Sequence, residues 1–162
     1  MPVDSLATVP TSNPPGPLVT VDRVHTAREV AAELGIDLLV LTPGSDLRYL
    51  CGYDAHAMER LTALVVPRRE EPFLVVPRLE APMVDAGPAG GLGLEVLAWD
   101  ETDDPFALLA RTVTARLGAA PTRVAVGART WAEHALGVQQ HRRHGRHRNG
   151  AVTAAGAAGA AG

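Results

Sequence analysis

The sequence has 162 residues, 46% of them hydrophobic, a formal net charge of −3 and a single cysteine. This length accommodates one domain with its own core, and the apolar fraction excludes a chain that is disordered throughout. The small net charge gives no overall reason to expect nucleic acid or an anionic membrane as a partner, and one cysteine excludes an internal disulfide framework. We expect a soluble cytoplasmic protein, because there is no secretory signal and no apolar run approaches the ~20 residues that cross a bilayer.

Composition divides the chain into three parts. Residues 1–19 are predicted to be a flexible leader, because Met1–Pro17 contain five prolines and few residues that could pack. Residues 20–137 carry the periodic patterns of a folded domain. Residues 138–162 are rich in Arg and His and then in Ala and Gly. Because this tail has no apolar stripe to bury, it is predicted to be disordered or at best loosely helical.

The folded part begins with a helix that leads into a buried strand. From Asp22 onward, apolar residues recur at spacings of three and four and predict a helix that ends before Gly35. The continuous apolar run Ile36–Leu41 is typical of a strand buried on both faces. A helix joined to such a strand through one glycine indicates an α/β domain. The predicted apolar face of the helix consists of Val24, Ala27, Val30, Ala31 and Leu34.

The patterns that follow continue the alternation of helices and strands. Thr42-Pro-Gly44 predicts a turn, and Ser45 or Asp46 can cap a short helix that Gly52 ends. Two further apolar runs flank the polar segment Pro67–Pro72, which has the length of a hairpin loop. The expected elements are strands Leu61–Val66 and Phe73–Val76, helix Arg78–Ala86, loop Gly87–Gly93, strand Leu94–Trp99, helix Phe106–Leu117, strand Arg123–Gly127 and a helix starting at Trp131–Leu136.

Several of these segments together resemble a known domain. The matching residues are Gly35-Ile-Asp-Leu-Leu-Val-Leu-Thr-Pro43, Asp46-Leu-Arg-Tyr-Leu-Cys-Gly-Tyr53, and the paired strands that end Leu64-Val-Val-Pro67 and Val75-Val-Pro-Arg78. Over residues 20–137 the sequence resembles the N-terminal domain of the creatinase/prolidase family, which includes Xaa-Pro aminopeptidases and Xaa-Pro dipeptidases. The resemblance implies an α/β fold, a mixed β-sheet with helices on both faces that is similar to ribonuclease H.

The resemblance also implies where the chemistry of such an enzyme resides. In full-length members a second, catalytic domain binds two divalent metal ions, typically manganese, through two Asp, one His and two Glu, and hydrolyses the bond before proline. None of those ligand motifs occurs in this sequence, so no catalytic residue, metal ligand or cofactor is assigned to it. The N-terminal domain contributes oligomer assembly and one side of the active-site entrance. Its partners would be a second copy or a companion catalytic domain.

The loop after the short helix carries the candidates for that entrance. Tyr53, Asp54, His56 and Arg60 form a polar stretch that could reach a substrate or a partner subunit's active site. The alternative is a solvated loop whose side chains bond locally. His56 and Glu59 are three residues apart and could share a helical face as metal ligands or as an acid/base pair, but two ligands without a third are a weak indication.

Other chemistry-bearing residues have simpler interpretations. Cys51 together with His56 could indicate a thiol nucleophile, but a lone Cys between Leu50 and Gly52 is more often a small buried apolar residue. The acidic run Asp100–Asp104 could bind a hard cation, but it more simply caps a helix. Gly90–Gly93 does not follow a strand and open a helix, so it is not predicted to bind phosphate.

The Arg/His-rich tail allows several readings. His141, His144 and His147 lie among arginines and could bind a metal or nucleic-acid phosphates, although an unselected tail is favoured because no aromatic residue is present for base stacking. The abrupt change of composition after Val138 is what a frameshift in a GC-rich gene would produce, and the absence of lysine fits such a genome.

Three functional hypotheses follow. The first is a non-catalytic N-terminal domain of an Xaa-Pro metallopeptidase, truncated or frameshifted and inactive alone. The second is a stand-alone dimerisation or interaction module. The third, a nucleic-acid binder with a basic tail, is the least favoured of the three.

Overall fold

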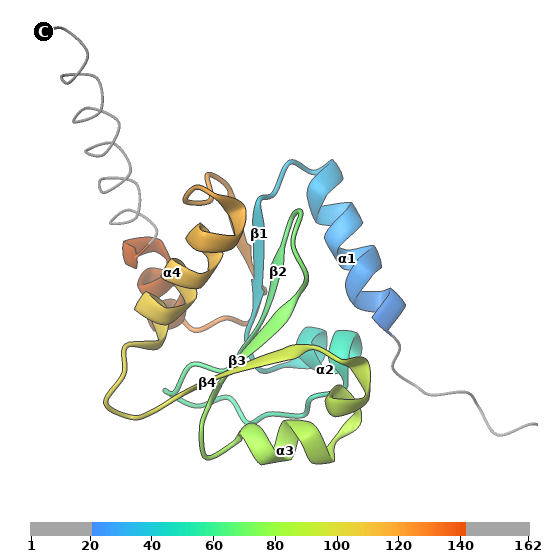
Figure 1. The fold of residues 1–162 in the computed structure, drawn as a ribbon, viewed down its shortest axis with the longest axis vertical. Helices are drawn as coiled ribbons and strands as arrows, with labels where there is room; N and C mark the ends of the chain where they lie inside the picture. Colours follow the sequence, from blue (N-terminus) through green and yellow to red (C-terminus); the bar gives the residue numbers. More distant parts are fainter. Residues whose placement is uncertain (1–20, 142–162) are drawn as a thin grey trace, which may run out of the picture.

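The computed structural model describes residues 21–141, which form a five-stranded mixed sheet with helices on both faces (Figure 1). The strand order is β4-β3-β2-β1-β5. This architecture confirms the fold class that the resemblance implied. The strands are β1 (Leu38–Leu41), β2 (Ala63–Pro67), β3 (Phe73–Pro77), β4 (Glu95–Trp99) and β5 (Val124–Val126). The helices are α1 (Val21–Glu33), α2 (Ser45–Cys51), α3 (Ala81–Ala86), the 3₁₀ helix η1 (Pro88–Leu92) and α4 (Pro105–Leu117), and residues 132–141 are also helical.

Strand direction changes twice across the sheet. β2 runs antiparallel to both of its neighbours. Its Pro67 lies opposite Leu38 of β1, and its Leu64 lies opposite Leu74 of β3. The outer pairs β3–β4 and β1–β5 are parallel. All residues of β2 and β3 are buried, because central strands covered by helices on both faces have no solvent side.

The core consists of two clusters, one on each face of the sheet. One cluster joins α1, α2 and α3 to the sheet, and the other joins α4 and the helix at 132–141 to it. Figure 1 shows α1 on one side of the sheet and α4 on the other. The alternating side chains of β2 divide between the clusters, with Leu64 and Val66 in the first and Ala63 and Val65 in the second.

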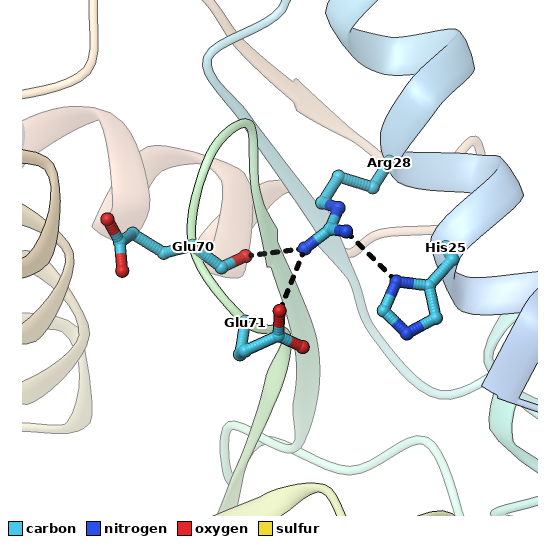
Figure 2. A network of polar contacts seen from close by, with 4 residues as sticks. All are labelled: His25, Arg28, Glu70 and Glu71. Atoms are coloured by element: carbon cyan, nitrogen blue, oxygen red, sulfur yellow. Dashed lines mark hydrogen bonds and ion pairs between the residues drawn. The ribbon is translucent and has the colours of Figure 1, made fainter.

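Arg28 ties α1 to the loop between β2 and β3. Its Nη1 donates to the backbone oxygen of Glu70 at 3.3 Å and to Oε1 of Glu71 at 3.2 Å (Figure 2). The Nδ1 atom of His25, one helical turn earlier, lies 3.0 Å from Nη2. Arg28 therefore carries a tertiary contact that orients α1 against the β2–β3 hairpin.

The predicted loop at Gly87–Gly93 is wrong, because residues Pro88–Leu92 form the 3₁₀ helix η1. Pro88 suits a first helical position, and the amide of Gly90 donates to the carbonyl of Gly87 at 3.1 Å. The predicted helix at Arg78–Ala86 begins only at Ala81, because the amide of Arg78 still donates to Trp99 of β4 at 2.8 Å. The glycine and proline content of this segment thus led to a loop prediction for a 3₁₀ helix.

Gly90→Ala is expected to destabilise the domain by about 1–3 kcal/mol, the usual cost of overpacking a site that cannot expand. A Cβ at Gly90 would lie 2.5 Å from the backbone oxygen of Asp85, so α3 would have to move. Gly91→Ala is the matched control, because a Cβ at that position meets nothing within 4 Å. The free energies of unfolding in urea should differ between the two variants, and equal values would contradict the packing described at Gly90.

The folded part extends beyond the predicted boundary at residue 137. Val138 lies within the helix at 132–141, is only 6% exposed and belongs to the core cluster under α4. Nε2 of His141 lies 3.0 Å from Oδ2 of Asp104 at the start of α4. The predicted boundary therefore falls inside a packed helix. The sequence pattern did not indicate this because Gln and His residues follow the one buried apolar side chain, Val138. The rest of the predicted tail (142–162) and the predicted leader (1–19) lie outside the described residues.

Candidate active-site entrance

The candidate segment connects α2 to β2. Gly52 ends α2 with a left-handed φ of 72°, and its amide donates to the carbonyl of Arg48 at 2.9 Å. A residue with a side chain would be strained in this conformation, so the glycine fixes where the chain leaves the helix. Residues 53–62 then run without helix or strand to β2. The segment therefore starts and ends at fixed points of the core.

Tyr53 is buried at the start of the segment. Its side chain is 5% exposed, and its hydroxyl donates to Oε2 of Glu80 at 3.4 Å. Thr62 donates to the same oxygen at 3.2 Å. Burial and the neighbouring Glu80 carboxylate raise the pKa of Tyr53 to about 12, because both disfavour a phenolate. The hydrogen bond from Tyr53 anchors the segment to Glu80, the residue before α3. The role of Tyr53 as an entrance residue stays a prediction.

The other three candidates differ in exposure and in the residues they pair with. Asp54 is exposed and forms an ion pair with Arg48 at 3.5 Å. His56 is exposed, and Arg60 pairs with Glu101 of the acidic turn at 3.3 Å. Within residues 21–141, no hydrogen bond or ion pair joins any two of the four predicted residues. Asp54, His56 and Arg60 stay a prediction as entrance residues, and their exposure leaves Asp54 and His56 accessible to a neighbouring domain.

The segment offers no metal centre of its own. Across residues 21–141, no three His, Cys, Asp or Glu side chains are grouped so that they could hold a metal ion. The donor atoms of the described domain therefore do not fit a dinuclear metal site, including the pair His56 and Glu59.

His134 holds the end of the segment in place, a role that sequence reasoning missed. The imidazole is 2% exposed and lies 6.0 Å from the Trp131 ring and 6.1 Å from the Phe106 ring, measured between centroids. Its Nε2 lies 3.2 Å from the backbone oxygen of Glu59. Because a carbonyl only accepts, the proton is assigned to Nε2, and the buried Nδ1 has no hydrogen-bond partner. The aromatic residue three positions earlier was the available indication that this histidine is packed.

Cys51 is a core residue and not a nucleophile. Its side chain is fully buried, and Sγ donates to the Leu47 carbonyl at 3.3 Å. Burial raises the pKa of the thiol, which keeps it in the unreactive neutral form. The simpler interpretation from the sequence is confirmed.

The acidic turn before α4 is engaged in capping and ion pairs. The Asp104 carboxylate accepts hydrogen bonds from the amides of Phe106 and Ala107 at 2.9 and 3.0 Å. Desolvation acts to raise its pKa, but these amides and His141 outweigh that effect and the pKa is lowered. Asp100 pairs with Arg78 at 2.7 Å. The capping interpretation is confirmed for Asp104, the N-cap residue of α4.

Comparison with known proteins identifies the domain. The model of the creatinase/prolidase N-terminal domain matches residues 23–140. The chain belongs to the creatinase/prolidase family. The probable dipeptidase PepE of Mycobacterium bovis is 45% identical over 104 residues, which cover 64% of this chain and 27% of that protein. The chain thus spans about a quarter of the length of this curated relative.

Solved structures of the family agree with the fold. The crystal structure of dipeptidase PepE from Mycobacterium ulcerans has a TM-score of 0.68 and 39% identity, covering 75% of this chain and 32% of that one. The N-terminal domain of an Xaa-Pro dipeptidase from Lactobacillus brevis has a TM-score of 0.66 at 20% identity, covering 74% of this chain and 87% of that one. The second likeness shows the fold alone. Among residues 21–141, no helix combines the length and apolarity that a membrane span needs.

Proposed function

We propose that this chain is the non-catalytic N-terminal domain of an Xaa-Pro metallopeptidase, where it serves assembly and shapes the active-site entrance. The match of residues 23–140 to the family's N-terminal domain, within only 27% of the length of a dipeptidase relative, carries the proposal. The catalytic step and the two divalent metal ions would belong to a companion catalytic domain. The single, buried cysteine fits a cytoplasmic enzyme.

Three residues of the 53–62 segment are proposed to face that companion domain. Asp54 and His56 are exposed, and Arg60 is held at its guanidinium by Glu101. Fixed ends and exposed polar side chains are the usual properties of a loop that completes a site on another rigid unit. Tyr53 and His134 would act through this loop by fixing its position.

The purified chain is expected to show no hydrolysis of an Xaa-Pro dipeptide with manganese added, because the described residues supply no dinuclear site. Release of free proline above a metal-free blank would overturn this prediction. A full-length dipeptidase of the family, assayed in parallel, is the positive control for substrate and metal.

A stand-alone interaction module is the second candidate. It is favoured by large apolar side chains on the surface, including Trp131 at 44% and Leu136 at 54% exposed. A stable dimer in sedimentation velocity, together with a separately encoded catalytic domain that binds it, would favour this candidate over the first.

We further propose that the change of composition after Val138 reflects a frameshift. The Arg/His-rich and Ala/Gly-rich stretches are the support for it. Sequencing the coding DNA beyond codon 138 tests it, because a frameshift requires another frame that continues the family's domain order.

A further inference from the structure

An apolar groove lies between α1 and α2. Figure 1 shows α1 on the side of the sheet away from α4. The volume of the groove is about 500 Å³. Val30 is 48% exposed, and Leu34 and Tyr49 are each 61% exposed. Two of the five residues of the apolar face predicted for α1, Val30 and Leu34, therefore have little cover within the described residues. The apolar lining includes Ala27, Val30, Leu34, Ile36, Leu39 and Tyr49.

Arg23 fixes the aromatic part of this groove. Its guanidinium lies 4.5 Å from the centroid of the Tyr49 ring, and Nη1 donates to the Tyr49 carbonyl at 3.0 Å. This pairing joins the first turn of α1 to α2 and holds the ring in place. The groove is therefore preformed around one oriented aromatic side chain, the arrangement that proline-rich segments bind in their extended helical form.

We propose that the proline-rich segment that precedes α1, residues 1–20, binds in this groove. The segment joins α1 at Val21, next to Arg23, so it is tethered at the end of its own binding site. Such a tether gives an effective concentration on the order of millimolar. Even a weak interaction between the segment and the groove is then sufficient.

The lengths of the segment and the groove agree. α1 has 13 residues and is about 20 Å long. Val9–Pro15, Val-Pro-Thr-Ser-Asn-Pro-Pro, has seven residues and spans about 22 Å as a polyproline II helix. Gly16, between Pro15 and Pro17, lets the chain reverse before it enters α1.

The chemistry of the segment also suits the groove. Asp4 is the only charged side chain among its 20 residues, so burial there removes little charge from water. Val9 and the prolines offer apolar surface to Val30, Leu34 and Tyr49. Prolines also lower the entropy lost on binding, because their φ is already fixed.

A nitroxide on the full chain at Ser12→Cys tests the proposal by NMR. The methyl signals of Val30 and Leu34 are expected to be lost through paramagnetic broadening, while those of Leu136, on the opposite side of the sheet, are retained. Cys51 is fully buried, and the wild-type chain treated with the same reagent checks that it stays unlabelled. Unchanged Val30 and Leu34 signals in the labelled chain would overturn the proposal.

Two further samples distinguish binding of the chain's own segment from binding of a second copy of the chain. Val30→Glu in the labelled chain is expected to restore the Leu34 signal, whereas the matched surface change Leu136→Glu leaves it broadened. Isotope-labelled wild type mixed with unlabelled chains that carry the nitroxide reports on a second copy. Broadening of Leu34 in that mixture as strong as within one chain would show that the groove binds another molecule, and would refute the intramolecular assignment.

Discussion

Phe73→Ala is expected to lower the free energy of unfolding by about 3–5 kcal/mol, the usual cost of deleting a buried aromatic ring. Phe73 is fully buried at the start of β3, opposite Val65 of β2 and Glu95 of β4. The change would leave a cavity in a strand whose two neighbours are both hydrogen-bonded to it. Small domains have about 5–15 kcal/mol of stability in total, so this variant is expected to approach the unfolding threshold.

Urea unfolding followed by circular dichroism measures this effect. Leu79→Ala is the control, because Leu79 is 74% exposed and such surface changes stay within about 0.5 kcal/mol. If Phe73→Ala does not fold, Phe73→Leu replaces it with an expected loss below about 1.5 kcal/mol. A Phe73→Ala variant as stable as Leu79→Ala would contradict the buried position of the ring.

The free energy of unfolding is expected to fall by roughly 2–3 kcal/mol between pH 10 and 12 because of Tyr53. This corresponds to about 1.4 kcal/mol per pKa unit. The folded-state pKa of Tyr53 is raised from 10.0 to about 12, first by burial and then by Glu80. In the unfolded chain the hydroxyl ionises near pH 10, whereas in the folded chain it keeps its proton to about pH 12. The stabilisation is therefore complete below pH 10 and is lost as the pH rises through this window.

The comparison of wild type with Tyr53→Phe isolates this contribution. The chain has no lysine and only two tyrosines, so few groups titrate in this window, and the raised pKa of Cys51 is common to both proteins. Tyr53→Phe is expected to flatten the dependence of unfolding free energy on pH, whereas Tyr49→Phe, at an exposed site, is expected to keep it. Equal slopes in wild type and Tyr53→Phe would show that Tyr53 is not buried beside Glu80.

Periodicity in the sequence placed most helices and strands within a few residues of their observed bounds. The run Ile36–Leu41 predicted β1, and Gly52 ends α2 as predicted, with a left-handed φ. These features depend on neighbouring residues only, through side-chain spacing, caps and the conformations open to glycine. The family resemblance depended on the same local segments and was confirmed over residues 23–140.

Tertiary contacts decided what local patterns could not. The sequence placed Tyr53 in a polar loop, but the structure buries it. Its hydroxyl donates to Glu80, 27 residues away along the chain, and Thr62 donates to the same carboxylate oxygen. His134 became a support of the candidate segment only because the helix at 132–141 packs against residues near Glu59.

By itself, therefore, the sequence determined the family, the order of helices and strands, and the interpretations of Cys51 and Asp104. The tertiary structure decided which polar residues of the 53–62 segment are exposed, and it leaves Val30 and Leu34 of the predicted apolar face largely uncovered by the other residues of 21–141. The reason is physical: caps and periodicity act over a few residues, whereas burial depends on which distant elements come to cover each side chain.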